Sequence, residues 1–256
     1  ILKGIISLLV SQVFIKIIGL IYKLYLTNKD GFGDSGNAIY SSGFQIYALL
    51  LTFSSTGVPN AISYLVSERL AVGDNRGAHK IFKIAFVTFA MIGITGSILL
   101  FMGANVIANS WIQIPEAKYS LVALSPSIFF VSITSVIRGY FNGRQNFSLT
   151  AKSQTIEQIF KTVFTVALVE LVVILGKENA QIMAASANMA TTIATISSFI
   201  YIYLYYRMKR REIGQEIAET VNYKPTRIRK TLKKIINVAL PISISSLISS
   251  FGKNID

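Results

Sequence analysis

Apolar runs of about 20 residues recur along the chain, and they constrain its fold more than any other feature, because one such helix spans the hydrocarbon core of a membrane. Seven runs have this length, with boundaries uncertain by about three residues: 4–27, 37–66, 80–104, 119–141, 150–175, 180–206 and 232–252. A soluble domain would not repeat such runs, and 52% of the residues are hydrophobic against 14% charged. The sequence therefore predicts an all-α, polytopic membrane protein.

The charge of the chain is lopsided, with 25 Lys and Arg against 12 Asp and Glu. Most of the basic residues, Arg138 among them, fall in or beside the segments between spans two and three, four and five, and six and seven. The opposite side of the predicted membrane holds only Lys29, Lys118 and Lys177. Cytoplasmic loops carry such an excess of basic residues. We therefore predict a multi-pass protein of the cell membrane with a cytoplasmic amino terminus, and the topology accounts for most of the net charge of +13 without nucleic acid.

Polar and basic residues 207–231 separate the last span from the six before it. This segment is long enough to link two lobes across the cytoplasmic face, as an amphipathic helix at the anionic lipid surface. The sequence thus predicts a six-helix amino-terminal lobe (1–206), a linker (207–231) and the start of a second lobe with helix seven (232–256), as part of a longer chain. With no cysteine and a single histidine, His79, it predicts no metal site and no cofactor.

Two lysines interrupt the otherwise uncharged first span. Gln12, Lys16, Gly19 and Lys23 are spaced four, three and four apart, so they share one stripe of a helix. At about 1.5 Å per residue, Lys16 lies roughly 18 Å into the span, near the bilayer midplane. A lysine that faced lipid there would cost about 2.5–3.5 kcal/mol. We therefore expect Gln12, Lys16 and Lys23 to line a protein interior or a watery cavity.

Glu157 and Lys161 are the corresponding charges of the fifth span, four residues apart on one helix face. Lys161 lies about 16 Å in from Thr150, close to the predicted depth of Lys16. Two lysines at one depth, with a glutamate one turn below, indicate a shared polar interior. The alternative is that Glu157 and Lys161 form a buried pair that only fastens helices together.

Gly57 and Pro59 interrupt the second span. Proline removes a backbone donor and clashes with the preceding turn, so we expect a kink there. That kink is either a fixed bend for packing or a hinge for conformational change. The earlier segment 31–36 spells G-x-G-x-x-G, but an apolar helix precedes it and no acidic residue stands about 20 positions later, so we expect a turn and not a dinucleotide site.

Several stretches of the chain resemble one family of membrane proteins. They are GLIYKL (19–24), STGVPNAISYLVSE (55–68), RGYFNGRQN (138–146) and SQTIEQ (153–158). Together they resemble the polysaccharide biosynthesis and stage V sporulation protein B branch of the multidrug/oligosaccharidyl-lipid/polysaccharide (MOP) exporter superfamily, which is related to the lipid II flippases. The resemblance covers the whole chain, and it departs from the family in the loop at 33–37, which is longer than the usual glycine turn.

The resemblance implies two facing lobes of helices, of which this chain supplies the first together with helix seven. It also implies alternating access, in which a central cavity takes up a lipid-linked saccharide head group from the cytoplasm and releases it outside. Basic cavity residues of such flippases meet the pyrophosphate. Lys16 matches the family's basic position in helix one, Lys23 a position where a basic residue is common, and Glu157 the acidic residue of helix five. The grounds for Lys161 are weaker.

Three functions follow from these features. The first is a flippase for an undecaprenyl-pyrophosphate-linked peptidoglycan or polysaccharide precursor, because lysines in a low-dielectric cavity attract a pyrophosphate. The second is an ion-coupled exporter of organic cations, which would favour acidic cavity residues, and the first lobe offers mainly Glu157. The third is a scaffold, which would not need Lys16 and Lys161 at the midplane. No paired carboxylates, activated nucleophile or phosphate loop indicates an enzyme. The expected partners are a lipid-linked saccharide, membrane lipids and, for coupled transport, an ion.

Overall fold

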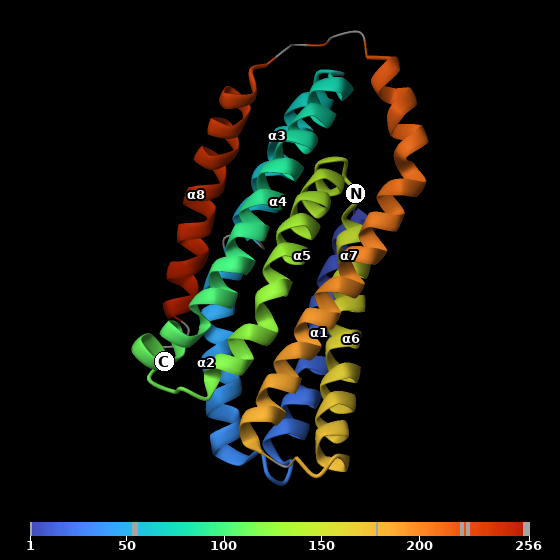
Figure 1. Ribbon diagram of the computed structural model, residues 1–256. Helices are drawn as coiled ribbons and strands as arrows, with labels where there is room; N and C mark the ends of the chain where they lie inside the picture. The colour runs from blue at the N-terminus through green and yellow to red at the C-terminus, as the bar shows by residue number, and fades with distance from the viewer. Residues whose placement is uncertain (1, 53–55, 178, 221–222, 224–225, 253–256) are drawn as a thin grey trace.

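The computed structural model describes residues 2–52, 56–177, 179–220, 223 and 226–252. Within them every regular element is helical, and the long helices form one elongated bundle (Figure 1). In chain order the elements are α1 (Leu2–Thr27), α2 (Gly33–Thr52), α3 (Val58–Ala71), α4 (Asn75–Val106), the π-helical segment η2 (Ile107–Ile112), α5 (Ala117–Gly143), α6 (Phe147–Ile174), α7 (Ala180–Ala218) and α8 (Ile228–Gly252). The predicted all-α fold is confirmed.

Four of the described helices are long and apolar enough to cross a membrane. They are Ile6–Thr27, Asn75–Ile112, Ala117–Gly143 and Ala180–Ala218, which correspond to predicted spans one, three, four and six. These four make the chain a multi-pass membrane protein. The second predicted span is divided between α2 and α3, and α6 carries four charged side chains. Because α6 packs between α1 and α7, its charges Glu157 and Lys161 need not meet lipid, whereas Lys152 is exposed. Crossing by the remaining helices stays a prediction.

The turn between α1 and α2 contains the G-x-G-x-x-G segment. Gly31 and Gly33 adopt left-handed backbone angles, with φ of 78° and 49°, and α2 begins at the second of them. A helix and not a strand precedes this turn. The segment is therefore a helix–helix turn, as the sequence indicated.

The central helix is α5, which packs against α2, α3, α4, α6 and α7. From Val131 to Phe141 each residue is buried except Arg138, which is partly exposed. Gly139 lets α3 approach closely, because a Cβ at this position would lie 2.7 Å from the carbonyl oxygen of Pro59. Inside a membrane the hydrophobic effect does not drive helices together, so small residues that allow close packing stabilise their contacts.

A break separates α2 from α3 at the predicted kink. Thr56 and Gly57 form a π-type turn, residues 53–55 lie outside the described residues, and Pro59 falls in the first turn of α3, where a missing N–H is tolerated. A Cβ at Gly57 would overlap the side chain of Ser243 and approach the carbonyl oxygen of Ala239 to 2.6 Å. Gly57 thus permits contact between α3 and α8. The hinge role of Gly57 and Pro59 stays a prediction.

The helix α7 is longer than its predicted span, because residues 207–218 of the predicted linker continue it. Strong helix formers such as Arg, Lys, Glu and Gln dominate this extension. The end of α7 and the start of α8 lie at the same end of the bundle (Figure 1), where Lys80 Nζ donates to the carbonyl oxygen of Thr226 at 2.8 Å. The division into a first lobe (1–206), a linker (207–231) and a second lobe (232–256) stays a prediction.

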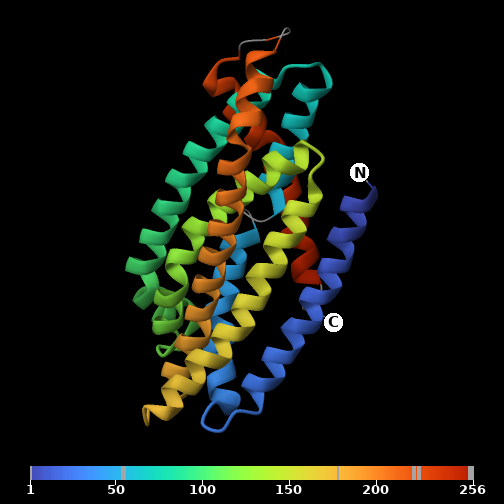
Figure 2. The same ribbon diagram turned by 90° about the vertical axis from the view of Figure 1, so that its right-hand side faces the viewer.

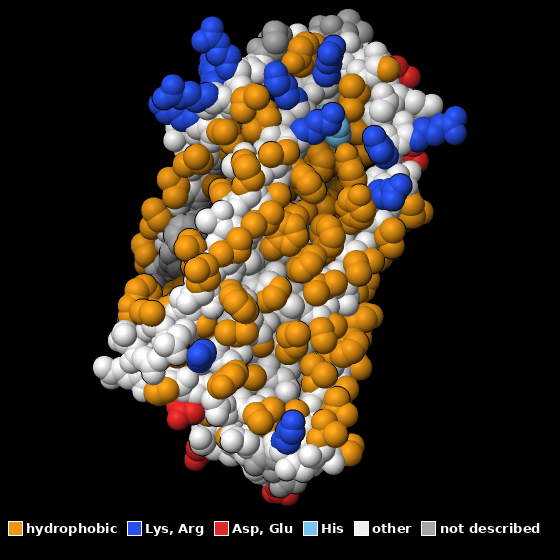
Figure 3. Space-filling view, viewed as in Figure 1, with side chains coloured by type: hydrophobic (Ala, Val, Ile, Leu, Met, Phe, Trp, Pro, Cys, Tyr) orange, Lys and Arg blue, Asp and Glu red, His pale blue; other side chains and the backbone are white. Residues whose placement is uncertain are grey.

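The basic side chains gather at this same end of the bundle. Figure 3 shows them along the upper edge, whereas hydrophobic side chains cover most of the face below. At the side of the bundle lies α1, which packs chiefly against α6 and leaves much of its surface uncovered (Figure 2). Its exposed residues include Val13, Ile17 and Leu20.

We expect Gly139→Ala to destabilise the protein by about 1–3 kcal/mol, because the added methyl group meets the backbone of α3 and forces the two helices apart. Thermal unfolding in detergent measures this effect. Gly103→Ala is the matched control in the membrane-spanning part of α4, where a Cβ meets only the tip of Ile107 at 3.6 Å. An equal or smaller loss in Gly139→Ala than in Gly103→Ala would contradict the close approach of α3 and α5.

Candidate functional site

A partly open cavity of about 220 Å³, lined by both polar and apolar side chains, lies between α1, α2, α5, α6 and α7. Its polar lining consists of Gln12, Tyr47, Arg138, Gln154, Glu157, Gln158, Lys161 and Thr191. A polar cavity lined by charged side chains is unusual in an apolar bundle, because each charge must be satisfied there by the protein or by water. Three of the predicted site residues, Gln12, Glu157 and Lys161, line it.

Arg138 of α5 connects three of the helices that line this cavity. Its Nη2 donates to Glu157 Oε2 and to Ser198 Oγ, each at 2.9 Å, and its Nε donates to Ser153 Oγ at 2.9 Å. The side chain of Arg138 is 11% exposed and that of Glu157 is 29% exposed. The guanidinium group therefore joins α5, α6 and α7 through charge-assisted hydrogen bonds.

The partner of Glu157 differs from the sequence interpretation. The sequence leaves open a structural pair of Glu157 with Lys161, but Glu157 pairs with Arg138. Arg138 had been counted only among the basic residues of the cytoplasmic side. It nevertheless lies inside the apolar run 119–141, and a charge inside such a run is the signal that could have identified it as a site residue.

Lys161 is buried, with 8% of its surface exposed, and it has no acidic partner within the described residues. Its Nζ lies 4.3 Å from the ring centroid of Phe44 and 5.2 Å from that of Tyr22. The faces of aromatic rings attract a cation, so these two side chains stabilise the ammonium group without neutralising it. The cavity thus carries two cationic side chains against one carboxylate.

The predicted stripe of α1 divides between the cavity and the exposed edge of the bundle. Gln12 Nε2 donates to Gln154 Oε1 at 2.8 Å, and Gly19 lies against Gln158, so this side of the helix faces α6. Lys16 and Lys23 are exposed, and neither lines the cavity. Their contact with a substrate stays a prediction.

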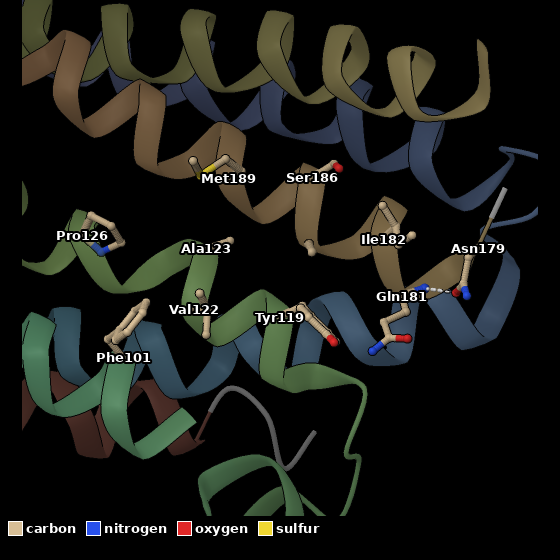
Figure 4. Close-up of a pocket in the computed structure, with 11 residues that line it drawn as sticks. Phe101, Tyr119, Val122, Ala123, Pro126, Asn179, Gln181, Ile182, Ser186 and Met189 are labelled. Atoms are coloured by element: carbon tan, nitrogen blue, oxygen red, sulfur yellow. Dashed lines mark hydrogen bonds between the residues drawn. The ribbon is translucent and has the colours of Figure 1, made fainter. Parts of the chain in front are cut away.

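A larger, apolar groove of about 680 Å³ lies between α4, α5 and α7. Phe101, Val122, Pro126 and Met189 border it, with Tyr119 and Gln181 toward one end (Figure 4). No acidic or basic side chain is among its described lining residues. The groove therefore lacks the groups that would recognise a charged head group, whereas the smaller cavity has them.

The helices thus form a multi-pass membrane bundle with charged side chains in a cavity between α1, α2, α5, α6 and α7. The chain belongs to the polysaccharide biosynthesis protein family, whose model matches residues 1–256. The resemblance seen in the sequence, to the polysaccharide biosynthesis branch of the MOP superfamily, is thereby confirmed.

Two curated relatives come from Bacillus subtilis. Stage V sporulation protein B is 24% identical over 252 residues, which are 98% of this chain and 47% of that protein. The lipid II flippase MurJ is 25% identical over 233 residues, which are 88% of this chain and 42% of that protein. The chain thus spans somewhat less than half the length of these relatives.

Solved structures show the same fold. A MATE protein in the straight conformation matches with a TM-score of 0.80 and 16% identity, over 98% of this chain and 53% of that one. A multidrug resistance MATE family transporter of the MOP superfamily, in an outward-facing conformation, matches with a TM-score of 0.75 and 18% identity, over 97% of this chain and 54% of that one.

We expect Arg138→Gln to lower the free energy of unfolding by about 2–4 kcal/mol, because it leaves Glu157 without its counter-ion. The double variant Arg138→Gln/Glu157→Gln should recover part of this loss, since no unpaired carboxylate remains. Unfolding in detergent measures both, with the exposed Lys152→Gln on α6 as the control. If the double variant were as unstable as the sum of the two single variants, the pair would not be coupled.

Proposed function

We propose that this chain forms the first lobe of a flippase that moves an undecaprenyl-pyrophosphate-linked saccharide, a peptidoglycan or polysaccharide precursor, across the cytoplasmic membrane by alternating access. The observation that carries this proposal is the excess of positive charge in the cavity. Arg138 neutralises Glu157, and Lys161 is buried against two aromatic rings with no acidic partner within the described residues. A buried ammonium group of this kind favours an anionic ligand.

The relatives support the same class of substrate, because one of them is named a lipid II flippase. The basic end of the bundle, toward which the start of α1 points, would face the cytoplasm by the positive-inside rule. In this proposal the head group enters from that end, and the break at Gly57 and Pro59 acts as a hinge between the two states.

Lys16 and Lys23 have a place in this proposal although they lie outside the cavity. They occupy the side of α1 that no other described helix covers. A second lobe that faced this side would enclose them in a shared space. They would then extend the positive surface from Lys161 toward the second lobe, where the saccharide-linked pyrophosphate would pass.

The test is binding of a polyprenyl-pyrophosphate-linked saccharide to the purified full-length protein. We expect Lys161→Gln to weaken binding by at least about tenfold, or 1.4 kcal/mol, whereas Lys152→Gln on the exposed side of the same helix changes it little. Lys161→Arg should retain most of the affinity, since the charge is kept. A folded wild-type protein that does not bind the ligand would contradict the flippase function.

The second candidate is an ion-coupled exporter of organic cations. The specific observation in its favour is the fold shared with MATE transporters, together with Glu157 in the cavity. The two functions predict opposite effects of the same variants. An exporter of cations would bind ethidium, and Glu157→Gln would abolish this binding whereas Lys161→Gln would leave it unchanged.

The exposed position of Lys16 gives a further prediction. The described chain contains no cysteine, so Lys16→Cys in a cysteine-free full-length protein provides a single reactive thiol. We expect a membrane-impermeant thiol reagent to label it in at least one conformational state, because it would face a watery space between the lobes. Val13→Cys, also exposed on α1, is the comparison. Protection of Lys16→Cys in every state would remove it from the substrate path.

A further inference from the structure

A second basic hollow lies at the edge of the hydrophobic face. It has a volume of about 420 Å³ and is formed by α4 and α7 at the basic end of the bundle. It shares no lining residue with the cavity around Arg138 and Lys161. Figure 3 shows a hollow in the upper part of this face, with basic side chains on its rim and hydrophobic side chains below.

Three cationic side chains converge on this hollow, Lys83 from α4 and Arg207 and Arg210 from α7. None of the three forms an ion pair within the described residues. The acidic residues of the same part of α7 are already engaged, since Glu212 pairs with Lys209 at 2.8 Å and Glu216 pairs with Arg144. The hollow therefore has positive charge on two sides and no acidic counter-ion of its own.

The rest of the lining is aromatic and apolar. Tyr203 and Tyr206 lie on the same face of α7 as the two arginines, and Ile213 and Ile217 continue that face by helical spacing. Beside them on α4, His79 has a buried Nδ1 atom with no hydrogen-bond partner within the described residues. Tyrosine beside arginine, where an apolar helix face ends, is typical of the level of lipid head groups.

We propose that this hollow binds the phosphate of an anionic phospholipid head group. The cations would neutralise the phosphodiester, and the acyl chains would continue down the hydrophobic face of α4 and α7. A free phosphate would use the cations only, and the apolar part of the lining would gain nothing from it. The composition of the hollow therefore favours a lipid over a soluble anion, and it adds a lipid site to the substrate cavity proposed above.

The test titrates the purified full-length protein in neutral detergent with phosphatidylglycerol and counts bound lipids by native mass spectrometry. The site variant is Lys83→Gln/Arg207→Gln/Arg210→Gln. The control variant, Arg211→Gln/Arg229→Gln/Lys233→Gln, removes the same charge from exposed residues outside the hollow. We expect the affinity of the tightest site to fall by about tenfold or more in the site variant and by less than about threefold in the control.

Equal losses of phosphatidylglycerol affinity in the two variants would show that the lipid is attracted to the basic surface as a whole. This result would overturn the proposal. Equal binding of phosphatidylcholine by the wild type would overturn it too. Glycerol 3-phosphate serves as the soluble competitor, and displacement of the lipid at equal concentrations would show that a free phosphate is recognised instead. If the triple variant does not fold, the three single variants replace it, and unchanged affinity in all of them would contradict the site.

Discussion

A charged side chain inside a membrane must find its partners within the protein, and this constraint organises the centre of the bundle. Arg138 meets it by contacting Glu157, Ser153 and Ser198, which come from α6 and α7. Hydrogen-bonded ion pairs of this kind have defined geometry, so they fix how the helices sit relative to one another. The same contacts leave Lys161 as the uncompensated charge. The contacts of Arg138 therefore both fix the packing of α5, α6 and α7 and leave the cavity with a net positive charge.

The other helices are arranged around that centre by two simple rules. Where backbones must come close, glycine occupies the contact, as at Gly139 between α5 and α3 and at Gly57 between α3 and α8. Where α6 carries Glu157 and Lys161, its neighbours α1, α5 and α7 surround them, whereas its Lys152 is exposed. Apolar residues then cover the face shown in Figure 3, below the basic end. The fold thus separates an interior with charged and polar side chains from a surface suited to lipid.

Hydropathy alone predicted the helical membrane fold, because long apolar runs have few other solutions. Spacing alone also placed Gln12 on a polar stripe and Lys161 in the interior, since the period of a helix fixes which residues share a face. Spacing cannot show which neighbour meets that face. The sequence therefore left a Glu157–Lys161 pair on one helix open, whereas the partner of Glu157 is Arg138 on another helix. Lys16 and Lys23 are exposed and do not line the cavity, and their contact with a substrate stays a prediction. The positive-inside rule accounts for Arg138 as one of many basic residues on the cytoplasmic side. For that reason the sequence analysis did not single out Arg138 as a site residue.

The length of α7 has a mechanical consequence. Its 39 residues make a rod of about 58 Å, nearly twice the thickness of the hydrocarbon core. Tilting such a rod by about 10° around one end displaces the other end by roughly 10 Å, which is close to two helical turns. A small rotation deep in the membrane would thus become a large displacement at the carboxyl end of α7, at Ala218. The extension of α7 beyond the membrane core would therefore amplify any rotation of its membrane-spanning part.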